Sequence, residues 1–236
     1  SFDMEMSAQI YVGATKEAQA KLCWNQAKDF IESPVANFNL RKMGFYTRQS
    51  IIHFGPTKST MMPLGGDSKT QDGINSHLSI IDEYHAHPTD GVKENLESSS
   101  VNRRNPITYH ITTAGTNIAS VCKNYEDSVI EVLEGRKIDH SLWVMIHDLD
   151  EGDDWEDHNN WYKANPLLGQ GLKIENIVKE YTKAKNQPSK VPNFKTKHLN
   201  MWVDAPVIWI PNEIWKRNKV GEITLNHFKE FRCYAT

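Results

Sequence analysis

Two adjacent carboxylates at the end of an apolar run are the side chains of this sequence best placed to do chemistry. Asp82 and Glu83 directly follow residues 78–81 (LSII), a short apolar run typical of a strand buried on both faces. Such a strand would deliver both acids to the carboxyl edge of a sheet, where open α/β folds bind ligands. This is the form of a Walker B motif: Asp82 would hold Mg²⁺ through water, and Glu83 would activate the water that attacks a γ-phosphate. A strand that merely ends in surface acids explains the segment equally well when it is taken alone.

A pair of hydroxyls ends the next expected strand. Thr112 and Thr113 close the run 107–113 (ITYHITT). If the two strands are neighbours, these hydroxyls lie beside Asp82 and Glu83, where they could sense a γ-phosphate directly or through a water. Threonines that simply cap a strand at a turn are the alternative, and the order and spacing of the two motifs together weaken it.

A third polar pair lies at an expected strand-to-helix junction. Thr15 and Gln19 are four residues apart, so a helix that begins here places both side chains on one face. Thr15 is also the expected N-cap of that helix. A cap followed by a solvated glutamine is the simpler explanation of this pair on its own.

Three other patterns suggest chemistry but are incomplete. Residues 55–60 (GPTKST) resemble the tail of a P-loop, yet they lack the glycine directly before Lys58 and lie between two β-rich runs, so the sequence contains no Walker A motif. His85 and His87 could bind a transition metal together with Asp82, as in a metal-dependent hydrolase, although no third and fourth ligands are evident. Seven of the ten residues 148–157 are acidic, but their spacing is not that of an EF-hand, and a solvated loop is favoured.

These candidate groups fall within an alternation of strand and helix signals. The sequence predicts strands at 9–14, 45–54, 59–64, 78–81, 107–113 and 142–146, and helices at 16–32, 90–100 and 118–133. The first helix should bury an apolar face made of Ala18, Leu22, Ala27, Phe30 and Ile31. Such alternation predicts an open, mostly parallel α/β sheet.

The character of the chain changes near residue 150. A helix is expected at 174–184, and six of the seven tryptophans lie in the second half of the chain. Residues from about 150 onward should therefore form a smaller, mainly helical and loop-rich subdomain packed by aromatic side chains.

Composition excludes several classes of protein. The 236 residues carry a net charge of -3 and have no apolar run near the roughly 18 residues of a membrane span. Cys23, Cys122 and Cys233 form no CxxC pair, which suits a reducing cytosol. Membrane, collagenous, disulfide-stapled and disordered classes are excluded, and contact with nucleic acid would need a local basic patch.

The chain resembles the large subunit of tailed-phage terminases, the ATP-driven motors that package DNA. The similar segments run in the family's order over nearly the whole chain: 9–20 (QIYVGATKEAQA), 63–87, 105–117 (NPITYHITTAGTN), 161–169 (WYKANPLLG) and 198–211 (HLNMWVDAPVIWIP).

The resemblance implies a P-loop NTPase-like fold of the ASCE type, with an ATPase core at 1–149 and a linker or lid at 150–236. It makes Asp82 and Glu83 the Walker B acids, with Mg²⁺ on Asp82, and makes Thr112 and Thr113 part of the coupling motif. ATP and Mg²⁺ are the implied cofactors, with Thr15 and Gln19 near the nucleotide. The implied partners are double-stranded DNA, the terminase small subunit and the portal protein, in a homo-oligomeric ring on the prohead within the bacterial cytoplasm.

Two departures from the family shape the expectation for this chain. The family has a Walker A loop before the segment at 9–20, and an RNase H-like nuclease domain after the linker. We therefore expect an internal fragment of a terminase ATPase, or a defective prophage remnant, that lacks the first, P-loop strand, binds ATP weakly or not at all, and has no nuclease activity. A non-catalytic interaction module is a further alternative for the chain itself. Arg103 and Arg104 are possible charge partners for phosphate or a neighbouring subunit, with a solvated loop favoured.

Overall fold

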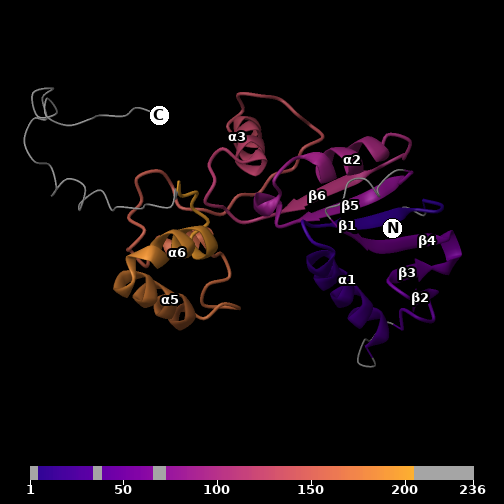
Figure 1. The fold of residues 1–236 in the computed structure, drawn as a ribbon, viewed down its shortest axis with the longest axis horizontal. Helices are drawn as coiled ribbons and strands as arrows, with labels where there is room; N and C mark the ends of the chain where they lie inside the picture. The colour runs from indigo at the N-terminus through magenta and orange to yellow at the C-terminus, as the bar shows by residue number, and fades with distance from the viewer. Residues whose placement is uncertain (1–4, 34–38, 66–72, 205–236) are drawn as a thin grey trace, which may run out of the picture. The chain divides into compact units, whose positions relative to one another are not determined.

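The structure, a computed structural model, describes residues 5–33, 39–65 and 73–204. Figure 1 shows its strands and helices in chain order. The strands are β1 (Gln9–Gly13), β2 (Phe45–Arg48), β3 (Ile51–Phe54), β4 (Ser59–Leu64), β5 (Ser76–Asp82) and β6 (Ile107–Ile111). The α-helices are α1 (Glu17–Glu32), α2 (Gly91–Ser99), α3 (Val121–Leu133), α4 (Trp161–Ala164), α5 (Ile174–Asn186) and α6 (Val191–His198). None of these described helices is both long and apolar enough to cross a bilayer.

The six strands form one mixed sheet in the order β2-β3-β4-β1-β5-β6. β1 pairs in parallel with both β4 and β5, and β6 pairs in parallel with β5. Only the hairpin partners β2–β3 and β3–β4 are antiparallel. The expectation of a mostly parallel α/β sheet is confirmed. The parallel pairing places the carboxyl ends of β1, β5 and β6 at one common edge.

Two apolar layers cover the central strand β1, because successive side chains of a strand point to opposite faces. Tyr11 packs in the cluster that contains Leu96 of α2, whereas Val12 packs in the cluster that contains Ala20 of α1. Gly13 permits close approach: a Cβ atom there would lie 3.1 Å from Val92 Cγ1 and 3.3 Å from Leu96 Cδ1. The sheet therefore lies between α1 on one face and α2 on the other (Figure 1), and Cys122 of α3 joins the cluster on the α2 side.

β5 is buried on both faces, as its sequence predicts. Ser76, His77, Ser79 and Ile81 are all buried. The Ser76 and Ser79 hydroxyls lie 2.7 Å apart and satisfy each other within the core. The strand that carries Asp82 is thus held rigidly in the middle of the domain.

The first helix departs from its predicted details. α1 begins at Glu17 with Lys16 as its N-cap, so the prediction of Thr15 as the cap is wrong. Ile31 is buried as predicted, but Leu22 and Phe30 are 65% and 69% exposed, and Ala20 and Trp24 complete the buried face. Trp24 sets this face because its ring packs on the sheet and its Nε1 donates a hydrogen bond to the Met61 carbonyl.

Two strand predictions are wrong. The run 45–54 is a hairpin rather than one strand, since the chain reverses at Gln49, which has a left-handed φ of 51°. Residues 142–146 (LWVMI) alternate in exposure like a strand, yet they pair with no other strand in the part of the chain that the structure describes. Trp143 and Met145 remain 69% and 61% exposed. A β-prone sequence becomes a strand only where a partner edge satisfies its backbone.

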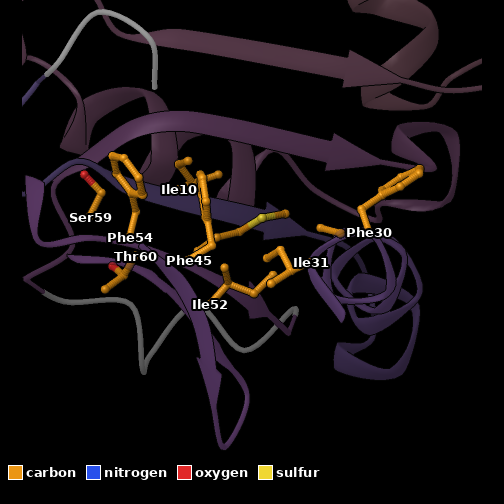
Figure 2. Close-up of a pocket in the computed structure, with 10 residues that line it drawn as sticks. Ile10, Phe30, Ile31, Phe45, Ile52, Phe54, Ser59 and Thr60 are labelled. Carbon is orange, nitrogen blue, oxygen red and sulfur yellow. The ribbon is translucent and has the colours of Figure 1, made fainter. Parts of the chain in front are cut away.

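An apolar pocket of about 260 Å³ lies between α1 and the β2–β3 hairpin. Figure 2 shows its lining, which includes Ile31, Phe45 and Ile52. Ile10, Ser59 and Thr60 also line it, and these residues lie at the amino ends of β1 and β4. The pocket is therefore separate from the carboxyl edge, and none of the predicted site residues lines it.

The last described part of the chain is helical and aromatic, as predicted. Trp161, Phe194 and Leu199 are almost fully buried in one cluster, with Trp155 and Tyr181 packed against it. Part of the acidic loop is ion-paired with α4: Lys163 Nζ lies 2.6 Å from Asp150 and 2.7 Å from Asp153. This supports an ion-paired surface loop rather than a calcium site.

Candidate active site

The predicted carboxylate and hydroxyl pairs lie at the ends of neighbouring parallel strands. In the β5–β6 register Asp82 is opposite Ile111, so Glu83 and Thr112 each come next along the chain at the same edge. The backbone N–H of His85 donates to Thr112 Oγ1 at 2.9 Å and ties the two ends together. The predicted juxtaposition is confirmed.

Asp82 is held in place by its own loop. Its Oδ1 accepts a hydrogen bond from the Glu83 backbone N–H at 3.0 Å, and its backbone oxygen lies 3.2 Å from His87 Nε2. The side chain is half-buried at the end of β5. A carboxylate in this setting is a hard oxygen donor of the kind that Mg²⁺ prefers.

Glu83 occupies an unusual backbone conformation. Its φ and ψ are 51° and 49°, in the left-handed region that non-glycine residues rarely adopt. Such conformations cost free energy and concentrate at functional sites. The turn directs the Glu83 side chain toward His85, whose Nδ1 lies 3.2 Å from Glu83 Oε2.

The hydroxyl pair is tied to the same loop and to a helix far along the chain. Thr112 Oγ1 donates to the Thr113 carbonyl at 3.0 Å and lies 3.1 Å from His85 Nδ1. Lys197 of α6 donates to Thr113 Oγ1 at 3.4 Å and lies 3.1 Å from His85 Nε2. Sequence reasoning missed Lys197, because it is one of many lysines in its region and no local spacing distinguishes it.

The segment after α6 docks on the residues that follow Thr113. The Ala114 N–H donates to Asn200 Oδ1 at 2.6 Å, and the Val203 N–H donates to the Gly115 carbonyl at 3.3 Å. A Cβ atom on Gly115 would lie 3.1 Å from the Trp202 ring, so glycine permits this close approach. The C-terminal helical part is thereby bonded directly to the end of β6.

Thr15 and Gln19 are paired, but Thr15 precedes α1, so the prediction that both lie on one helix face is wrong. Thr15 Oγ1 donates to Gln19 Oε1 at 2.7 Å. Since Gly13 is opposite Ile81 in the β1–β5 register, Thr15 follows β1 at the same sheet edge as Asp82. All three predicted polar pairs therefore lie at one edge.

The two histidines do not converge on a metal site. His85 contacts Glu83, Thr112 and Lys197, whereas His87 is 4% exposed and its Nε2 faces a backbone oxygen. Burial lowers the pKa of both imidazoles, and the Lys197 cation lowers that of His85 further. Within the described ranges no three His, Cys, Asp or Glu side chains are placed to hold a metal ion.

Arg103 lies at the amino ends of the strands, away from the carboxyl edge, so the favoured prediction of a solvated loop is wrong for it and the alternative of a phosphate partner at that edge is not supported. The guanidinium bonds the carbonyls of Met6, Ser7 and Asn75 and pairs with Glu5. Its side chain is only 7% exposed. Arg103 precedes β6 and therefore joins the amino ends of the strands, which is a structural role. The neighbouring Arg104 is exposed.

The sheet and its carboxyl edge define a P-loop NTPase-like α/β domain, and comparison with known proteins identifies its family. The family model described as terminase large subunit, ATPase domain, matches residues 1–131. The model described as terminase large subunit, endonuclease domain, matches residues 136–227. The chain belongs to the terminase large-subunit family.

Individual relatives agree with this assignment. Protein YmfN of Escherichia coli (strain K12) is 36% identical over 162 residues, which cover 69% of this chain and 36% of that protein. The terminase large subunit of Enterobacteria phage HK97 is 22% identical over 231 residues, which cover 93% of this chain and 42% of that protein. The chain thus spans well under half the length of these two relatives.

A solved structure supports the fold. The crystal structure of the HK97 bacteriophage large terminase aligns with a TM-score of 0.71 and 22% identity, and the alignment covers 84% of this chain and 40% of that one. The matched endonuclease range, 136–227, overlaps the region expected to be a linker or lid. Its described part contains α4, α5 and α6.

Proposed function

We propose that this chain is part of the ATP-hydrolysing motor of a phage or prophage terminase large subunit, which moves double-stranded DNA into proheads. The observation that carries the proposal is the junction of two parallel strands: the loop with Asp82 and Glu83 is hydrogen-bonded through His85 to Thr112. Ligands of open α/β sheets bind at this edge.

Each residue of the edge has a role that follows from its chemistry. Asp82 would hold Mg²⁺ through water, and the ion when bound neutralises charge that develops on the phosphate oxygens. Glu83 would orient and deprotonate the attacking water. The hydroxyls of Thr112 and Thr113 would respond to loss of the γ-phosphate. Thr15 and Gln19 would lie on the nucleotide side of β1.

The segment after α6 is hydrogen-bonded to the residues that follow Thr113, so movement of the threonines after loss of the γ-phosphate would be transmitted to the C-terminal helices. Asn200 and Val203 are hydrogen-bonded to residues 114 and 115, directly after the threonines. Residues 150–236 would act as the linker or lid that carries the movement. Double-stranded DNA, the small subunit, the portal protein and a ring of identical subunits on the prohead are the partners that this role needs.

The phosphate cradle is not among these 236 residues, which contain no GxxxxGK[ST] sequence. Backbone N–H groups and a lysine normally hold the β- and γ-phosphates in such sites. We therefore expect weak or no binding of Mg·ATP by these residues alone. β6 is an end strand of the described sheet, so its outer backbone groups could pair with a further strand.

Nuclease activity is not expected from this chain. Nucleases of the two-metal type hold their ions with clustered carboxylates, and residues 136–227 match the endonuclease-domain model, so this expectation needs a direct test. Mn²⁺-dependent cleavage of plasmid DNA by the purified chain would contradict this expectation.

The experiment that tests the proposed function is ATP turnover by a terminase large subunit that contains these residues together with a P-loop. Asp82→Asn should raise the Mg²⁺ concentration needed for half-maximal turnover by roughly tenfold or more, since the metal loses its charged partner. Glu151→Gln, in the exposed acidic loop, is the matched control and should leave the Mg²⁺ dependence unchanged. Unchanged Mg²⁺ dependence in Asp82→Asn would remove Asp82 from the metal site.

A further inference from the structure

Lys197 approaches the edge of the sheet from a helix that lies more than a hundred residues further along the chain. Its Nζ is 3.1 Å from His85 Nε2 and 3.4 Å from Thr113 Oγ1. The Lys197 side chain is at an exposed position, whereas the His85 side chain is only 14% exposed. The contact therefore joins an exposed surface cation to a partly enclosed imidazole beside Glu83.

The hydrogen-bond partners of His85 determine which of its ring nitrogens carries the proton. An ammonium group can only donate, so Nε2 must accept from Lys197 and carries no proton. The proton of the neutral ring is then on Nδ1, which lies 3.1 Å from Thr112 Oγ1 and 3.2 Å from Glu83 Oε2. The Thr112 hydroxyl donates its hydrogen to the Thr113 carbonyl, so Thr112 Oγ1 can only accept a hydrogen bond from His85. The imidazole N–H is thus hydrogen-bonded to Thr112, and the same nitrogen lies 3.2 Å from Glu83 Oε2, a buried oxygen without a hydrogen-bond partner among the described residues.

Burial and the charges around His85 favour the neutral imidazole over the charged one. Burial lowers the pKa of His85 most, and the Lys197 cation and His87 lower it further, while the Glu83 carboxylate raises it. Thr112, from the end of β6, contributes no charge. Protonation of Nε2 would place two donors against each other, so a charged His85 cannot keep its contact with Lys197.

We propose that Lys197 is a positioning residue for Glu83, acting through His85. The inference rests on the proposed role of Glu83 in water activation. Lys197 selects the tautomer that places a protonated Nδ1, rather than a lone pair, 3.2 Å from Glu83 Oε2, and Glu83 is already directed toward His85 by its left-handed backbone. The orientation of the water-activating carboxylate then depends on where α6 lies.

Hydrogen bonds between the segment after α6 and the end of β6 explain how the position of α6 could affect Glu83. Asn200 and Val203 attach the segment after α6 to residues 114 and 115. A displacement of the end of β6 therefore moves the anchor of α6 and the acceptors of His85 together. Withdrawal of Lys197 frees Nε2 and allows the second tautomer, in which the Nδ1 lone pair faces the Glu83 carboxylate and repels it.

The first experiment measures the tautomer and pKa of His85 in the full 236-residue chain by ¹⁵N-edited NMR of the imidazole rings, with His85→Gln to assign the signal. The native chain should show the Nδ1–H tautomer and a pKa below the ordinary value. Lys197→Met should raise the pKa of His85 and mix the tautomers, and Lys197→Arg should preserve the native behaviour. Lys190→Met removes an exposed lysine that precedes α6 and should change nothing.

A second variant keeps the test decisive if Lys197→Met perturbs folding. Glu83→Gln removes the anion that raises the pKa of His85, so that pKa should fall. A native-like pKa and tautomer ratio in either Lys197→Met or Glu83→Gln would overturn the proposed contact chain.

Turnover separates this inference from the proposed function. In a terminase large subunit that contains these residues and a P-loop, Lys197→Met should lower kcat roughly 10- to 100-fold, with KM nearly unchanged, because Glu83 loses its orientation. Lys197→Arg should restore most of the rate. Normal kcat in Lys197→Met alongside an inactive Glu83→Gln would overturn the positioning role alone, whereas normal turnover in Glu83→Gln would overturn the proposed function itself.

Discussion

The backbone N–H of His85 donates a hydrogen bond to Thr112 Oγ1 at 2.9 Å, which joins the loop after β5 to the end of β6. The two residues lie 27 positions apart in the sequence. Parallel strands alone would bring the carboxylate and hydroxyl pairs to one edge, but this bond makes them a single unit. A displacement of Thr112 must therefore reach the loop that carries Glu83.

Removal of this acceptor should loosen the loop without unfolding the domain. Thr112→Val loses the hydroxyl that accepts from His85 and should cost about 1 kcal/mol of unfolding free energy. Amide hydrogen exchange should show faster exchange at the His85 N–H. Thr116→Val, at an exposed position beyond the motif, should leave that exchange rate unchanged. Native protection of His85 in Thr112→Val would show that the bond does not hold the loop.

Asn200 should contribute through both its side chain and its backbone. Its Oδ1 accepts from Ala114, its Nδ2 donates to the His147 carbonyl, and its φ is 53°. Asn200→Ala should destabilise the chain by about 2–3 kcal/mol, because it loses two hydrogen bonds and keeps a strained backbone. Asn200→Gly relieves the strain and should cost about 1 kcal/mol less. Equal losses in urea unfolding of the two variants would contradict a left-handed Asn200.

His110 should make stability depend on pH. Burial, and then the Lys93 cation, lower the pKa of His110 from 6.5 to about 4. Between pH 6.5 and 4 His110 is therefore protonated in the unfolded chain but mostly neutral in the folded chain. The free energy of unfolding falls as the pH drops through this range. The full effect is about 3 kcal/mol at most.

Urea unfolding at several pH values between 7 and 4 measures this dependence. His110→Gln removes the titrating group and should flatten the profile, whatever its effect at pH 7. His140→Gln, at an exposed position, should leave the slope as it is. An unchanged slope in His110→Gln would show that other groups carry the acid sensitivity.

Gly13 should resist even the smallest side chain. A Cβ atom there would lie 3.1 Å from Val92 and 3.3 Å from Leu96, tighter than normal packing. Gly13→Ala should therefore force α2 away from β1 and cost about 1–3 kcal/mol. At Gly91, where the added atom would lie 3.6 Å from Thr89 Oγ1, alanine should be neutral or slightly stabilising in thermal unfolding. Equal melting temperatures for Gly13→Ala and the native chain would contradict the close approach.

The sequence could predict those features of the site that depend on local hydrophobic pattern, namely the strands that lead to Asp82 and Thr112. A buried apolar run before Asp82 and a β-prone run before Thr112 predict strands, and the α/β alternation predicts that these strands are parallel. The resulting juxtaposition at one edge needs no further information. The roles of these residues in hydrolysis stay a proposal.

What the sequence could not predict depends on contacts between distant segments. Lys197 meets His85 across 112 positions, and nothing in the local spacing of its lysine-rich region indicates that contact. The run 142–146 has strand propensity but lacks a paired neighbour among the described strands. The buried face of α1 depends on the Trp24 ring and its bond to Met61, which a count of aliphatic residues overlooks.

The central claim is that Glu83 activates water at the edge formed by β5 and β6. Single-turnover hydrolysis of ATP by Glu83→Gln, in a terminase large subunit that contains these residues and a P-loop, tests it most directly when ATP binding is measured in parallel. The account predicts native affinity for ATP together with a loss of the chemical step by roughly a hundredfold or more. A native rate of hydrolysis from bound ATP would contradict it.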